Sequence, residues 1–172
     1  MKNLLLALVA GLIIVSCQVP VEKQYFEESP DIDLGKKLMN AYLAQDWDAY
    51  PELYADTARI WLNKNWTKDE GFTVQQYIDD LKTQLETTSS YKFDPQNWEG
   101  IISNDGNHWV HFWGVWIGHS EATNKDYEIP VHFALQIVDN KIVRHGEFFN
   151  SVELTLDMMA LAEENTGEEE NQ

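Results

Sequence analysis

The sequence predicts an α+β domain in which N-terminal helices cover one face of a curved antiparallel sheet. In the first half of the chain, apolar residues recur at helical spacing, whereas from residue 93 onward the pattern has a period of two. Turn signals such as Asp105-Gly106 separate the later segments and are typical of hairpins. A chain of 172 residues with 44% hydrophobic residues normally forms one domain with a real core.

The N-terminal residues predict a targeting signal and a lipid anchor. Lys2 precedes an apolar run over residues 4–15, which is short for a membrane span and typical of a secretory signal. The run ends in IVSC at residues 14–17, which resembles the bacterial lipobox and implies cleavage before Cys17 and diacylglycerol on its thiol. Cys17 is the only cysteine of the chain, so it has no disulfide partner within it. An ordinary cleaved signal with an incidental cysteine is the alternative.

We therefore expect residues 1–16 to be a signal peptide and the mature protein to be held on the bilayer through Cys17. Its expected location is the bacterial cell envelope, on the periplasmic face or the cell surface. Residues 17–30 contain two prolines and no regular pattern, which predicts a tether. The globular domain is expected over residues 31–162.

The first half of that domain is expected to be largely helical. A helix begins near Asp31, with Leu34 and Leu38 on its apolar stripe, and Asp46 is expected to cap a second helix that carries apolar residues from 47 to 54. Residues 59–63 predict a short strand, followed by a polar loop that contains Trp66.

The next helix has the clearest start signal in the chain. Thr73 and Gln76 form a capping box, and apolar residues follow at helical spacing to Leu85.

The second half predicts a sheet of four antiparallel strands, over residues 96–104, 107–119, 127–138 and 141–150. A two-residue turn at Asp105-Gly106 would pair Asn104 with Asn107. Ser151 is expected to cap a last helix, and residues 163–172 are acidic, without aromatic residues, and expected to be disordered.

That register would divide the aromatic residues between two faces. The face toward the helices would form a pocket lined by Trp61, Trp98, Trp109, His111, Trp113, Val115, Phe133, Arg144, Phe148 and Asn150. The opposite face would carry Phe112, Trp116, His132, Glu147 and Phe149, which we interpret as a dimer surface.

Residues 31–155 resemble the nuclear transport factor 2-like superfamily, and within it the SnoaL-like branch. The resemblance rests on the order of elements, the YADTA segment at residues 54–58, the capped helix, and the final strands from DNKIVR at 139–144 to EFFN at 147–150. It implies a cone-shaped, cystatin-like α+β fold with a pocket between the helices and the concave sheet face. It also implies a homodimer.

The candidate catalytic residues are few. Enzymes of that branch commonly carry an Asp at the end of the last strand, where this sequence has Asn150, which cannot act as a general base. His111 is the titratable candidate among the predicted pocket residues of its strand, and Asp46 and Asp56 are further candidates from the first half. The sequence indicates no metal site and no cofactor. The net charge of −17 argues against nucleic acid.

Three functions remain open at this point. The first is a membrane-anchored domain that binds a small, mainly apolar ligand in an aromatic pocket, without established catalysis. The second is an acid–base enzyme of isomerase or cyclase type acting on a small hydrophobic substrate. The third is a non-catalytic dimeric interaction module. Fold resemblance does not separate them, because function depends on the site.

Mass spectrometry of the mature N-terminal peptide tests the lipidation prediction. We expect a peptide that starts at Cys17 and carries the added mass of a diacylglycerol group, and we expect the Cys17→Ser chain to lose that mass and its membrane association. A mature chain that begins at another residue, or an unmodified Cys17, would contradict the prediction.

Overall fold

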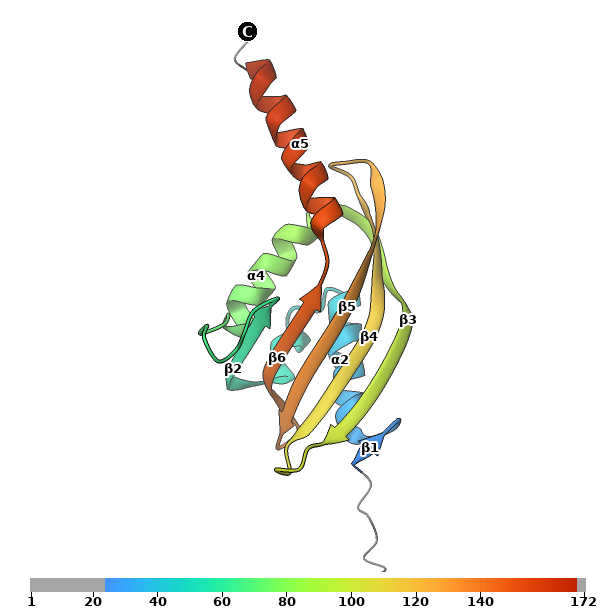
Figure 1. Ribbon diagram of the computed structural model, residues 1–172, viewed down its shortest axis with the longest axis vertical. Helices are drawn as coiled ribbons and strands as arrows, with labels where there is room; N and C mark the ends of the chain where they lie inside the picture. The colour runs from blue at the N-terminus through green and yellow to red at the C-terminus, as the bar shows by residue number, and fades with distance from the viewer. Residues whose placement is uncertain (1–23, 170–172) are drawn as a thin grey trace, which may run out of the picture.

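A single six-stranded sheet with helices on one face makes up most of the molecule (Figure 1). The computed structural model describes residues 24–169, with side chains to residue 163, so the predicted signal peptide and the first half of the tether, with Cys17, lie outside the described residues. The strands are β1 (Tyr25–Phe26), β2 (Tyr54–Leu62), β3 (Thr88–Ile102), β4 (His108–Ser120), β5 (Lys125–Val138) and β6 (Lys141–Phe149). Their order is β1-β3-β4-β5-β6-β2, and only the β2–β6 pair is parallel among the described strands.

The helices are α2 (Pro30–Leu43), α3 (Ala49–Glu52), α4 (Val74–Leu85) and α5 (Val152–Glu169). Figure 1 shows α2 behind the sheet, α4 beside β2 and β6, and α5 projecting beyond the end of the sheet. The fold class is therefore the predicted one: an α+β domain with helices packed on one face of a curved, open, mainly antiparallel sheet.

Local capping explains where two helices begin. The Ser29 hydroxyl accepts a hydrogen bond from the Ile32 N–H, and Pro30 occupies the first turn of α2, where its missing N–H is tolerated. The predicted capping box of α4 is confirmed, because Thr73 and Gln76 exchange side-chain and backbone hydrogen bonds. By contrast, the second helix is only one turn long, because Tyr54 already belongs to β2.

The hairpin between β3 and β4 differs from the predicted two-residue turn. Ser103 N–H donates to Asn107 O at 2.9 Å and Gly106 N–H donates to Ser103 O at 2.8 Å, so residues 104–106 form a three-residue loop. Gly106 has φ +80°, a left-handed conformation that glycine adopts without steric cost. The strands consequently pair Ile102 with His108, one residue away from the predicted register.

This single-residue shift reverses the faces of β4, because side chains alternate along a strand. Val110 and Phe112 point toward the helices and are fully buried, whereas Trp113 is 49% exposed. The prediction that Trp109, His111, Trp113 and Val115 line an inner pocket is therefore wrong: they lie on the outer face. Trp116 lies on the inner face with Phe112, not on a dimer surface.

A bulge reverses the faces of β6 in the same way. Ile137 pairs with Ile142, but Gln136 pairs with Arg144, so the register shifts between them. Glu147 and Phe149, predicted for the dimer surface, therefore join the inner face. Arg144 and Phe148, predicted for the pocket, turn outward.

The C-terminal helix also extends further than expected. Helix α5 continues to Glu169, whereas the acidic composition from residue 163 onward predicted a disordered tail. Residues 152–162 are rich in Leu, Met and Ala, which favour a helix, and the Glu residues of 163–169 extend it past Asn165, Thr166 and Gly167. Among the described residues, no helix is both long and apolar enough to cross a membrane.

Phe112 and Trp113 provide a direct test of the register. We expect Phe112→Ala to lower the free energy of unfolding by roughly 3–5 kcal/mol, because it leaves a cavity in the core. Trp113→Ala should lower it by about 1 kcal/mol or less, because that indole is half exposed. Urea unfolding measures both, and the reverse ranking would support the two-residue turn.

Candidate active site

The inner face of the sheet holds a buried polar cluster in an otherwise apolar core. We name it the inner cluster: Tyr50, Tyr54, Tyr77, His145 and Glu147. His145 is 1% exposed, and the three tyrosines are 2–4% exposed. The Glu147 side chain keeps 13% of its surface accessible, so the cluster reaches solvent at this carboxylate.

Three elements bring the inner cluster together. The bulge in β6 turns His145 and Glu147 to the inner face, two residues apart on the same strand. The parallel neighbour β2 begins with Tyr54, and α4 supplies Tyr77 from the buried side of its helix. Residues distant in the sequence therefore converge on one end of the last strand.

Hydrogen bonds link the members of the inner cluster in two groups. The Tyr54 hydroxyl lies 2.9 Å from His145 Nδ1 and 3.4 Å from the Tyr50 hydroxyl. The Tyr77 hydroxyl donates to Glu147 Oε2 at 2.5 Å. Between the groups, His145 Nε2 lies 3.9 Å from Glu147 Oε2, which is too long for a hydrogen bond.

His145 is held neutral with one unused nitrogen. Burial lowers the pKa of its imidazole to about 3, because the charged form is poorly solvated in the core. Within the described part of the chain, Nε2 is buried without a hydrogen-bond partner. Such an atom normally costs free energy, so it suggests a place where a ligand atom binds.

Glu147 has the opposite shift. Burial raises the pKa of its carboxyl to about 7, and the hydrogen bond from Tyr77 only partly offsets this effect. Burial also raises the pKa of Tyr50, Tyr54 and Tyr77, and the nearby Glu147 charge adds to each shift. Near neutral pH, Glu147 can therefore either accept or donate a proton, as a general acid–base group must.

Aromatic rings surround His145 and Glu147. Phe133 and Tyr77 each present an edge-on contact to the His145 ring, with centroids 5.4 and 5.8 Å away. Phe112 and Phe133 stack at 4.9 Å on the same face. The predicted pocket residues Trp98 and Phe133 do lie on this inner face, and Trp98 packs on Phe112. The inner cluster is therefore enclosed mainly by aromatic side chains.

The other predicted catalytic residues lie away from the inner cluster. His111 is on the outer face, where its Nδ1 lies 3.4 Å from His132 Nε2 and the two rings stack. Burial, and then the neighbouring His132, lower the pKa of His111. His132 lies on the outer face opposite Phe148, whereas Glu147 lies opposite Phe133.

The carboxylate and amide candidates have structural contacts at the surface. Asp46 is exposed and accepts a hydrogen bond from the Ala49 N–H at the start of α3. Asp56 is exposed on β2. Asn150 is exposed after β6 and accepts from the Val152 N–H at 3.3 Å, so its predicted place in the pocket is wrong. Trp61, also predicted there, lies on the outer side against Trp66.

Sequence reasoning missed most of the inner cluster. It assigned Tyr54 to a helix, treated Tyr77 as apolar core, and placed Glu147 on a dimer surface. The usable signal was His145 and Glu147 at a spacing of two, which puts two ionisable groups on one face of a strand. This spacing places the two side chains on the same face of the strand, but it does not show whether that face is the inner or the outer one.

The inner cluster does not resemble a metal site. Among residues 24–163, no group of three or more His, Cys, Asp or Glu side chains is placed to hold a metal ion.

Comparison with solved structures identifies the architecture. IdmH, a candidate polyketide cyclase from Streptomyces antibioticus, superposes with a TM-score of 0.59 at 16% identity over 76% of this chain and 99% of that one. A candidate polyketide cyclase from Xanthomonas campestris gives 0.58 at 17% identity over 73% and 93%. A protein of the nuclear transport factor 2-like class from Burkholderia xenovorans gives 0.57 at 13% over 77% and 98%. The chain has the nuclear transport factor 2-like, SnoaL-like fold.

By sequence, the chain matches no protein-family model and no curated protein. The fold that the sequence resemblance implied is thus confirmed by structure. At these identities the likeness concerns the fold, and the chemistry has to be argued from the inner cluster.

The pH dependence of stability tests the environment of Glu147. Its pKa is raised on folding from 4.5 to about 7, so protonation stabilises the fold as pH falls through this window. His145 acts in the opposite direction, because its pKa is lowered on folding from 6.5 to about 3. In the wild type the two effects on stability therefore oppose each other where the two pH windows overlap, between pH 4.5 and 6.5.

Glu147→Gln removes the ionisable group whose protonation stabilises the fold at low pH. Relative to wild type, the variant should lose up to about 3 kcal/mol of stability as pH is lowered from 8 to 4.5, since 1 pKa unit corresponds to about 1.4 kcal/mol. Urea unfolding at several pH values measures the difference. Parallel pH profiles for the two proteins would show that Glu147 is not perturbed.

Proposed function

We propose that this protein is an acid–base enzyme of isomerase or cyclase type that acts on a small hydrophobic carbonyl compound. The observation that carries the proposal is the pairing of a neutral, unsatisfied His145 with a buried Glu147 that can exchange protons near pH 7. Two ionisable groups with oppositely shifted pKa values are typical of general acid–base sites.

In this mechanism Glu147 is the base. Its carboxylate removes a proton from the carbon beside the substrate carbonyl, and the electron pair moves onto the carbonyl oxygen. Tyr77 donates a hydrogen bond to the carboxylate and holds it in place. The carboxyl then returns the proton to carbon, so that Glu147 is regenerated.

His145 would stabilise the negative oxygen. When the Tyr54 hydroxyl donates its proton to Nδ1 and accepts a hydrogen bond from Tyr50, Nε2 carries the imidazole proton and can donate a hydrogen bond to the substrate oxygen. Tyr54 would then be a positioning residue, because it selects the tautomer of His145. Phe112 and Phe133 favour a hydrophobic substrate through their place beside the inner cluster.

The structural neighbours support this class of reaction. Besides the candidate cyclases, a candidate isomerase from Bacillus subtilis shares the fold at a TM-score of 0.52 and 18% identity, over 72% of this chain and 88% of that one. Binding of a small apolar ligand without catalysis would use the same inner cluster. We further propose that the protein is anchored to the cell envelope through Cys17 and forms a homodimer, as the sequence resemblance implies.

Deuterium exchange tests the proposed chemistry without knowledge of the natural substrate. The protein is incubated in D₂O with a panel of small cyclic ketones, and NMR follows incorporation at the carbon beside the carbonyl. We expect exchange that increases as pH rises through about 7, because the base must be deprotonated. Glu147→Gln should lower the rate roughly 10²–10⁴-fold.

The matched control is Glu128→Gln, which changes an exposed carboxylate on β5 and should leave exchange unchanged. Ketones that bind without any exchange would favour the non-catalytic binding function. Exchange that persists in Glu147→Gln would assign the base to another residue.

A further inference from the structure

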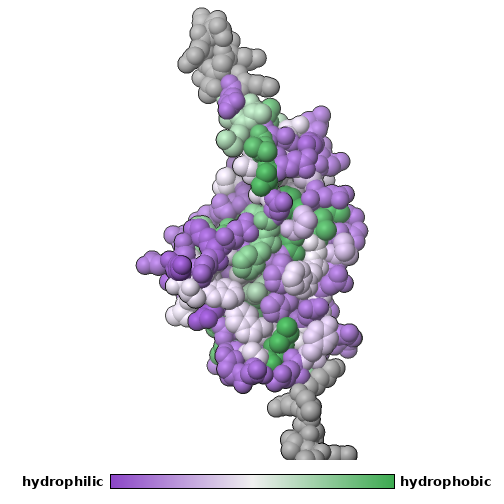
Figure 2. Space-filling model, viewed as in Figure 1, coloured by the Kyte–Doolittle hydropathy of each residue, from purple (hydrophilic) through white to green (hydrophobic). Residues whose placement is uncertain are grey.

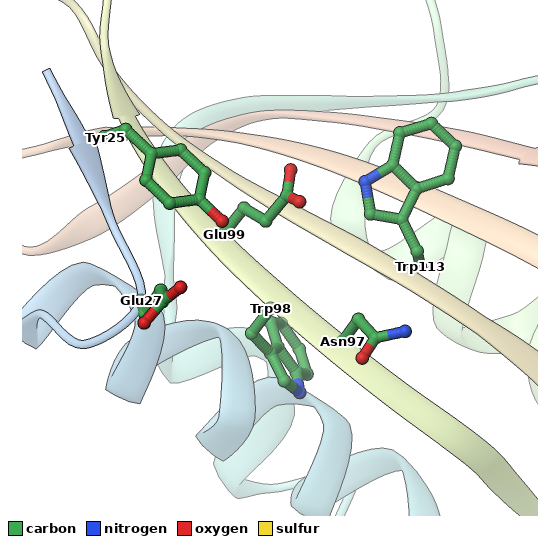
Figure 3. A pocket seen from close by; sticks show the side chains of 6 residues that line it. All are labelled: Tyr25, Glu27, Asn97, Trp98, Glu99 and Trp113. Carbon is green, nitrogen blue, oxygen red and sulfur yellow. The ribbon is translucent and has the colours of Figure 1, made fainter.

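A groove lies at the edge of the sheet away from β6 and β2, where β1 leaves β3 (Figure 3). This groove has a volume of about 530 Å³, within the usual range of small-molecule sites. It is lined by Tyr25, Glu27, Asn97, Trp98, Glu99 and Trp113. We call the space lined by these residues the β1–β3 groove. Its lining combines carboxylates with aromatic rings and contains no histidine, unlike the inner cluster.

The pairing of the strands explains how the groove forms. Tyr25 pairs with Ile101, and after Phe26 the chain leaves the sheet to enter α2. Beyond that point the edge of β3 is open. Asn97 pairs with Trp113 across β3 and β4, so both side chains stand on the outer face beside the open edge. Figure 3 shows the Tyr25 ring near Glu99 and the Trp113 indole across the hollow.

The groove has negative charge without any basic lining residue. In the described part of the chain, the carboxylates of Glu27 and Glu99 make no side-chain hydrogen bond or ion pair, although the charge of Glu99 acts on the nearby rings of His111 and His132. Partial desolvation, and then the charges of Glu99 and Glu27, raise the pKa of the Tyr25 hydroxyl, which indicates that both carboxylates act on the same space. The net charge of −17 adds a long-range attraction for cations.

The groove also exposes aromatic rings. Tyr25 and Trp113 are 45% and 49% exposed. One face of Trp113 stacks on His132 at 3.8 Å, which fixes the indole in place. Trp98 packs on Phe112 and forms a rigid wall toward α2. Rigid aromatic rings next to carboxylates attract organic cations in two ways: the ring face makes a cation–π contact, and the carboxylates attract the positive charge.

We propose that the β1–β3 groove binds an organic ammonium ion, with Glu27 and Glu99 supplying the counter-charge and Tyr25 and Trp113 the aromatic contacts. A bare metal ion is a poorer fit, because metal sites need several converging ligands and two carboxylates provide too few. The proposal does not depend on the acid–base chemistry of the inner cluster. The ammonium group could belong to a free molecule or to a phospholipid headgroup.

Calorimetric titration of the full chain in a neutral detergent tests the proposal. The probes are choline and ethanolamine, with the neutral carbon isostere of choline as the control ligand. We expect choline to bind in a salt-sensitive manner and its isostere to bind at least about 10-fold more weakly. Equal binding of choline and its isostere, or no binding of either ammonium probe up to millimolar concentration, would overturn the proposal.

Variants assign the binding to the groove. Glu27→Gln with Glu99→Gln should weaken choline binding about 10-fold or more, and Trp113→Leu about 5-fold. The matched control, Glu70→Gln, changes an exposed carboxylate outside the groove and should bind as wild type does. Wild-type affinity in the double variant would overturn the proposal. Urea unfolding of each variant verifies that the fold is retained.

Phosphatidylcholine vesicles then distinguish the two sources of the ammonium group. Vesicles that displace free choline would identify a lipid headgroup, whereas vesicles that leave choline binding unchanged would identify a free molecule.

Discussion

The packing of Phe112 determines how the rest of the domain is arranged. Its ring contacts Phe93, Trp98 and Phe133 at centroid distances of 5.5, 4.7 and 4.9 Å, and it is fully buried. These contacts join β3, β4 and β5 on the inner face. They also fix the position of Trp98, against which Gly35 of α2 packs so closely that a Cβ there would lie 2.7 Å from the indole. Helix α2 can approach the sheet only because residue 35 has no side chain.

The same inner face carries groups that a purely structural core would exclude. Burying a carboxyl and an imidazole without a hydrogen bond between them destabilises the fold, and the tyrosines compensate only in part. Aliphatic residues at positions 145 and 147 would pack without this desolvation cost. The inner cluster is the feature on which the proposed acid–base function rests, and its apolar surroundings maintain the shifted pKa values that the proposal uses.

The outer face has a different character. Figure 2, in the same view as Figure 1, shows hydrophobic side chains along α5 and in patches over the sheet, among hydrophilic surroundings. Trp113, His132 and His111 form a stack across β4 and β5. This stack holds Trp113 rigidly beside the β1–β3 groove, so the order of the outer face contributes to the second proposed site. The inner cluster lies at β6 and the β1–β3 groove lies near the other edge of the sheet, so the two proposed sites share no residue and can be tested separately.

The sequence by itself determined the fold class, the capping box of α4, the approximate strands and the resemblance to the SnoaL-like branch. These features depend on local periodicity, and Thr73, Gln76 and the alternating residues of β4 signal them directly. Only the tertiary structure decided which alternating set faces the helices. An aromatic residue occurs on both faces of β4, so hydrophobicity could not choose between Phe112 and Trp113.

Register was decided by three local details that composition does not encode: the three-residue loop that ends with Gly106, the pairing of Ser120 with Lys125 at the β4–β5 turn, and the bulge in β6 near Val143. Each shifts the pairing of two neighbouring strands by one residue. Because side chains alternate, such a shift exchanges the residues on the two faces of a strand. His145 and Glu147 could be read from the sequence as a pair on one side of a strand. Their burial beside Tyr54 and Tyr77, which gives them their chemistry, required the strands and α4 to be assembled.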